Sequence, residues 1–108
     1  MINGETRGTS TNGSIYGLVM AQRLPIRAGD EVKIVWRITG AGALRATLAA
    51  PDGSDVALAW GPHRHDGSTY TRPGAEWGIG YVFGQAGCWH LAFARDDTAG
   101  DVWLGIEA

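Results

Sequence analysis

Two short segments carry cysteine and histidine side chains at spacings that suit metal binding. Cys88 and His90 are separated by one residue, and so are His63 and His65. Residues two apart in a strand point to the same side, so each pair could offer ligands to zinc or copper. However, no methionine follows Cys88, as it would in a copper site of the cupredoxin type. An inert, buried cysteine with surface histidines is the more frequent arrangement. We therefore keep Cys88, His90, His63 and His65 as the less favoured metal site and predict no cofactor.

The same residues give little support for catalysis. Cys88 and His90 on one strand cannot act as nucleophile and base unless another element reorients them. The chain contains no Gly-x-Ser-x-Gly, His-Glu-x-x-His or phosphate-binding loop motif. Asp96, Asp97 and Asp101 lack the spacing of a calcium loop and fit an ordinary turn. We predict that the protein is not an enzyme.

Binding through exposed aromatic residues is better supported. If Val102, Leu104 and Ile106 face a core, Trp103 must face outward, beside the outward position of His90 on a neighbouring strand. Arg45 joins this face if the third strand neighbours the sixth. The alternative is that the N-terminal residues fold back and cover Trp103. A second candidate surface is the long segment 61–76 after Trp60, because long connections in compact domains are often functional.

These two surfaces supply the predicted binding residues. Trp and Tyr offer large, rigid contact areas with a polar handle, which suits a protein partner or a sugar ring. The predicted set is Trp103, His90, Arg45, Trp60, His63, His65 and Tyr70.

The elements that position these residues have the pattern of β-strands. In residues 31–39, Val32, Ile34, Trp36 and Ile38 alternate with mostly polar positions. Similar alternation, interrupted by Gly, Pro and Asp, predicts about seven strands: 15–20, 31–39, 44–49, 56–60, 77–83, 88–93 and 101–106. We predict an all-β, antiparallel sandwich, with a small barrel as the alternative. Gly78 and Gly80, inside one strand, predict the close approach of another backbone.

The length and charge of the chain further limit the possible fold and function classes. The 108 residues suit one domain, and residues 1–14 are so polar that we predict a flexible leader before a domain at 15–108. The net charge of -2 gives no field that would attract nucleic acid. No apolar run approaches the roughly 20 residues that a membrane helix needs. A single cysteine excludes an internal disulfide.

The segment FGQAGCWHL, residues 83–91, resembles the turn and penultimate strand of immunoglobulin-like domains, with Gly87, Trp89 and Leu91 at the characteristic places. Together with the closing GDVWL at 100–104, it also resembles small, uncharacterised bacterial exported or lipoprotein domains that end in a Gly-Cys-Trp strand. This resemblance implies an immunoglobulin-like sandwich. It also implies an extracytoplasmic location, secreted or lipid-anchored, with a targeting segment removed from the front.

The favoured function is a non-catalytic, extracytoplasmic interaction or structural module that binds a protein partner or self-associates. The alternatives are a carbohydrate-binding module that uses exposed aromatics and a Cys/His metal-binding module.

Overall fold

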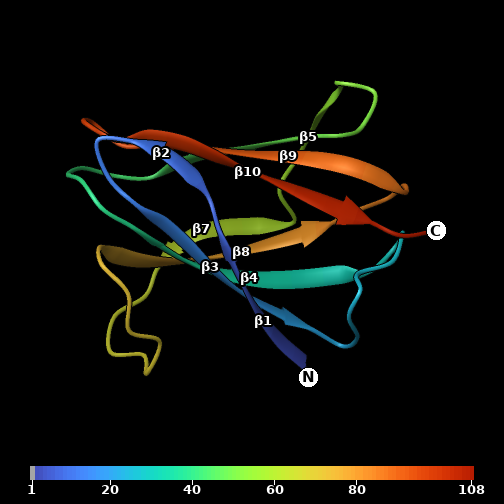
Figure 1. Ribbon diagram of the computed structural model, residues 1–108, viewed down its shortest axis with the longest axis horizontal. Helices are drawn as coiled ribbons and strands as arrows, with labels where there is room; N and C mark the ends of the chain where they lie inside the picture. The colour runs from blue at the N-terminus through green and yellow to red at the C-terminus, as the bar shows by residue number, and fades with distance from the viewer. Residues whose placement is uncertain (1) are drawn as a thin grey trace.

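The computed structural model describes residues 2–108, with side chains from residue 4. These residues form ten strands and no helix, arranged as two antiparallel sheets packed face to face (Figure 1). None of the elements in 2–108 is therefore a helix able to cross a membrane. Sheet A has the order β1 (Ile2–Arg7), β3 (Ile15–Ala21), β4 (Glu31–Ile38), β8 (Ala75–Val82) and β7 (Trp60–Arg64). Sheet B has the order β2 (Thr9–Thr11), β10 (Ala99–Ile106), β9 (Gly87–Ala94), β5 (Arg45–Ala49) and β6 (Asp55–Val56).

The all-β, two-layer prediction is confirmed, although the strands are more numerous than the expected seven. One reason is that residues 56–60 do not form a single strand. The chain leaves sheet B after Val56 and enters sheet A at Trp60, so the apolar alternation there spans two short strands in different sheets.

The N-terminal residues supply the other two additional strands. Residues 1–14 were predicted to be a flexible leader, but β1 pairs with β3 from Ile2 to Arg7, and β2 pairs with β10 from Thr9 to Thr11. Residue 1 lies outside the described residues. Edge strands are held by backbone hydrogen bonds, which any side chain allows, so a polar composition does not prevent pairing.

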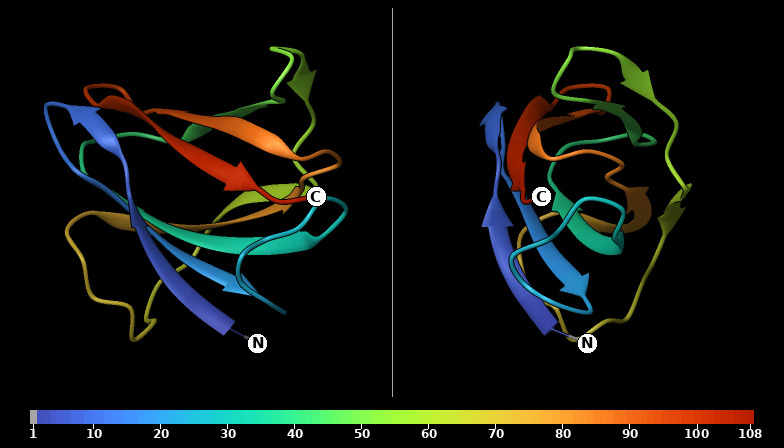
Figure 2. Two further views of the ribbon diagram at one scale, coloured as in Figure 1. Left: turned by 45° about the vertical axis from the view of Figure 1, so that its right-hand side comes forward. Right: turned by 90° about the vertical axis from the view of Figure 1, so that its right-hand side faces the viewer.

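The chain crosses between the sheets on both sides of the sandwich. On one side, Gly8 joins β1 of sheet A to β2 of sheet B. A Cβ at Gly8 would lie 2.8 Å from the Asp101 carbonyl oxygen and 2.9 Å from Val102 Cγ2, so glycine fits the crossing best. On the opposite side, residues 57–59 join β6 to β7. The end-on view in Figure 2 shows these crossings at the two flanks of the molecule.

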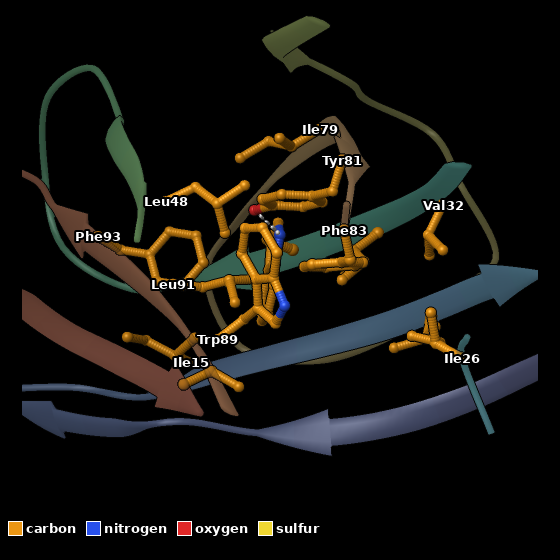
Figure 3. Close-up of a cluster of buried hydrophobic side chains, with 14 of the residues drawn as sticks. Ile15, Ile26, Val32, Leu48, Ile79, Tyr81, Phe83, Trp89, Leu91 and Phe93 are labelled. Carbon is orange, nitrogen blue, oxygen red and sulfur yellow. Dashed lines mark hydrogen bonds between the residues drawn. The ribbon is translucent and has the colours of Figure 1, made fainter. Parts of the chain in front are cut away.

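Alternate side chains of the two sheets meet in one aromatic-rich core (Figure 3). Trp36 of sheet A contacts Phe93 of sheet B with ring centroids 4.5 Å apart, and Phe83 meets Trp89 edge-on at 5.3 Å. Trp36 also donates its indole N–H to the hydroxyl of Tyr81. Large rings from both layers therefore fill the thin space between the sheets, as the period-two pattern predicted.

Candidate functional site

Trp103 is the most exposed large apolar residue among those described, with 63% of its surface open to solvent. It faces outward from β10, as the alternation predicted, and residues 2–11 do not cover it. Its ring stacks on the ring of His90 on β9, with centroids 4.2 Å apart and planes 18° from parallel. His90 Nε2 lies 2.7 Å from Asp101 Oδ2, which holds the imidazole in place. The exposed indole therefore rests on a fixed support.

Small side chains surround this aromatic pair. Ala49 is the cross-strand neighbour of His90 on β5, and Ala92 is the neighbour of Asp101 on β9. Thr47 and Arg45 lie farther along β5, opposite Ala92 and Ala94, so Arg45 joins the same face as predicted. We call the outward surface of β5, β9 and β10 around Trp103 the Trp103 face.

Two shallow hollows adjoin Ala92 on the Trp103 face. One, of about 420 Å³, lies toward Thr9, Thr11 and Ala99, and the other, of about 280 Å³, lies toward Arg45 and Thr47. The Trp103 face therefore carries both an exposed indole and two hollows that could receive one.

The structure does not bring the predicted metal ligands together. Cys88 and His90 lie on sheet B, whereas His63 belongs to β7 of sheet A and His65 follows that strand. Cys88 is exposed rather than buried. Within the part of the chain that the structure describes, no three His, Cys, Asp or Glu side chains are grouped to hold a metal ion. The four residues therefore do not form one site.

Trp60 and the residues after β7 form a second surface, on the outside of sheet A. A Cβ on Gly80 would collide with the Trp60 indole, so the ring lies directly on the strand at that glycine. The glycine pair was expected to admit another backbone, and here an aromatic side chain uses the space instead. His63 stacks against the same indole with centroids 5.6 Å apart.

A buried carboxylate holds residues 65–74 against sheet A. Glu76 is only 2% exposed, and its Oε2 lies 2.5 Å from His65 Nδ1. Its Oε1 accepts a hydrogen bond from Ser68 and lies 3.3 Å from Arg37 Nε. Arg37 also donates to the backbone oxygen of Tyr70 at 2.9 Å. This network fixes His65 and Tyr70, two of the predicted binding residues, over the outer face of the sheet.

Two adjoining hollows lie between this segment and sheet A. The larger, of about 240 Å³, has Leu18 and Met20 in its lining, and the smaller, of about 140 Å³, has Trp60 and His63. Both are lined by Lys33, Val35 and His65. We call the combined depression the Lys33 groove.

Three site residues were missed in the sequence. Asp101 had been assigned to turn chemistry, although its position two residues before Trp103 places both side chains on one face of a strand. Glu76 and Lys33 gave no recognisable pattern, because each becomes part of a site only when residues 65–74 fold onto sheet A.

Searches of protein-family models, curated proteins and solved structures give no match to this chain. The geometry of its own residues must carry any functional inference.

Proposed function

We propose that the protein is a non-catalytic, immunoglobulin-like interaction module that binds a second copy of this chain through its Trp103 face. The strand order supports the immunoglobulin-like part. With β1 and β2 set aside, β3-β4-β8-β7 faces β10-β9-β5-β6. These positions match the A-B-E-D and G-F-C orders of immunoglobulin sheets, with β6 as an added edge strand. The extracytoplasmic location implied by the Gly-Cys-Trp resemblance is part of the same proposal.

The exposure of Trp103 is the observation that carries the binding proposal. An indole is among the largest apolar surfaces that a residue can present, and Trp is enriched among residues that dominate binding energy. Because the stacked His90 and its partner Asp101 already hold the ring, little side-chain freedom remains to be lost on binding. The site is therefore organised before a partner arrives.

Shape and charge favour a second copy as the partner. A two-fold dimer places the same patch on both subunits, so a protrusion must find a recess within its own face. The Trp103 face has both, since the hollow beside Arg45 lies on the same surface as the indole. An indole entering that hollow would meet the Arg45 guanidinium, which interacts favourably with an aromatic face. The contact would occur twice in each dimer.

Sedimentation velocity over a range of protein concentrations tests this proposal. We expect the wild-type chain to form a dimer that Trp103→Ala weakens by about 30-fold, the scale of a hot-spot residue. Val82→Ala is the matched control, because Val82 is also exposed and apolar but belongs to sheet A. A wild-type chain that stays monomeric near 1 mM, a weak limit for specific association, would refute the proposal. Equal loss of dimer in both variants would also refute it.

Carbohydrate binding is the second candidate, favoured by the exposed Trp103 indole, which is stacked on His90, with the Asp101 carboxylate beside it. Sugar rings stack on indole faces while their hydroxyls bond to neighbouring polar groups. Titration of soluble polysaccharides, followed by tryptophan fluorescence of the wild type and Trp103→Ala, separates the two functions. A saturable response that disappears in Trp103→Ala, from a protein that stays monomeric, supports this candidate over the dimer.

A further inference from the structure

We propose that the Lys33 groove binds a small carboxylate-bearing ligand with a short apolar body. The groove lies on the outside of sheet A, whereas the Trp103 face lies on the outside of sheet B, so this site is independent of self-association. Three features of the groove support this ligand. Lys33 brings a positive charge to it, the carboxylate of Glu76 is already bound by neighbouring side chains, and the floor is apolar.

Lys33 is held where the two hollows of the groove meet. A Cβ built on Gly78 would lie 3.5 Å from the Trp60 ring and 3.6 Å from Lys33 Cε. The lysine stem and the indole therefore lie side by side over this glycine. None of the ion pairs among the described residues includes Lys33. Lys33 is a half-buried residue, and no salt bridge among the described residues neutralises its charge.

The carboxylate of Glu76, which lines the groove, is already bound by other side chains. Both oxygens of Glu76 are engaged, one by Ser68 and Arg37 and the other by His65. Arg37 offsets the charge of Glu76, and Arg64 in the lining is paired with Asp66, so the charge of Lys33 remains. The surplus charge of the groove is therefore positive, which complements an anionic ligand and disfavours a cationic one.

Apolar side chains form the floor of the groove. Val35 is 8% exposed and lies on the floor between the hollows, and Leu18 and Met20 continue the floor toward Tyr70. A surface ion pair in open water contributes little free energy, so a carboxylate alone would bind poorly here. An apolar chain lying on this floor adds the burial that makes binding measurable. The hollow with this apolar floor, of about 240 Å³, is by itself below the range of drug-sized sites, so the ligand that occupies it is small.

Titration with hexanoate, followed by backbone amide chemical shifts, tests the site in the full chain. We expect a Kd of about 1 mM, with shifts concentrated at Lys33, Val35 and residues 65–70. Acetate tests the need for the apolar body, hexan-1-ol the need for charge, and hexylamine the sign of the charge. We expect each of the three to bind about tenfold or more weakly, because charge and apolar contact are both required.

Lys33→Met keeps the apolar stem and removes the charge, so hexanoate affinity should fall about tenfold, whereas Lys33→Arg should largely restore it. Arg27→Met is the matched control, because Arg27 is exposed and lines neither hollow of the groove, and this variant should bind like the wild type. Unchanged thermal melting of both methionine variants confirms that the fold is intact. Hexylamine binding as tightly as hexanoate, shifts outside the groove, or full affinity in Lys33→Met would overturn the proposal.

Discussion

The indole N–H of Trp36 and the hydroxyl oxygen of Tyr81 are joined by a hydrogen bond of 3.0 Å in the middle of an otherwise apolar core. Both side chains are fully buried. Each polar group would be costly in this layer without the other, and together they fix how two of the largest core residues pack.

Tyr81→Phe should lower the free energy of unfolding by about 1–3 kcal/mol, because the Trp36 N–H loses its acceptor and cannot reach water. Urea denaturation measures this change. Tyr16→Phe is the control, since Tyr16 is only partly buried on the outside of sheet A. An equal decrease in the free energy of unfolding of both variants would show that the buried hydrogen bond contributes no more to stability than the hydroxyl of Tyr16.

Tyr81 also predicts how stability depends on alkaline pH. Burial raises the pKa of its hydroxyl above the usual value of about 10, and the hydrogen bond from Trp36 opposes that rise only in part. Above about pH 10 the unfolded chain loses this proton while the folded chain keeps it, so stability is complete below that pH and falls above it.

The loss of stability between about pH 10 and 11.5 should be smaller in Tyr81→Phe than in the wild type. It should not vanish, because burial and a hydrogen bond to Glu5 raise the pKa of Tyr70 as well. Melting temperatures across this range check the prediction. Parallel curves for the two proteins would contradict it.

The position of the Trp60 ring against β8 predicts that alanine substitutions at Gly80 and Gly78 affect stability differently. Gly80→Ala should destabilise the fold by about 1–3 kcal/mol, because the new methyl group would overlap the indole. Gly78→Ala should stay within about 0.5 kcal/mol, since its methyl group would lie at ordinary contact distance, 3.5 Å from the ring. Chemical denaturation of both variants tests the pair, and similar values would mean that the ring is not fixed there.

Glu76→Gln should release residues 65–74 from sheet A. The substitution removes the charge that faces Arg37 and His65, and breaking a buried pair on one side costs about 3 kcal/mol or more. Amide hydrogen exchange should accelerate first in residues 65–74. Asp66→Asn is the control, because Asp66 is 80% exposed and its pair with Arg64 contributes little. Unchanged exchange in Glu76→Gln would contradict this prediction.

Alternation alone predicted the central strands and the direction of Trp103. In β4, β9 and β10, apolar residues on every second position must share one side, so Trp103 had to face away from Val102 and Leu104. The direction of Trp103 depends only on the spacing of residues within one strand, and this spacing can be read from the sequence. The neighbouring positions of β5 and β9, which bring Arg45 to the same face, followed from the expected sandwich topology.

Features that depend on contacts between distant segments were missed. Residues 2–11 have no apolar pattern, and only the free edges of β3 and β10 make strands of them. Val35 interrupts the alternation of β4 because residues 65–74 cover part of the outer face. Glu76 and Gly80 gain their roles from Ser68 and Trp60, which lie 8 and 20 positions away. Contacts between segments so far apart leave no periodic pattern in the sequence.

The crossings at Gly8 and at residues 57–59 determine how copies of this domain can meet. Open sheet edges expose backbone groups that recruit strands from other molecules and lead to aggregates. Here each lateral pair of edges is linked by the chain itself, and the strands flanking the crossings in sheet B, β2 and β6, have three and two residues. Templates so short offer an incoming strand few hydrogen bonds. In sheet B, the broad outer surface rather than the margins is therefore left as the natural place for recognition.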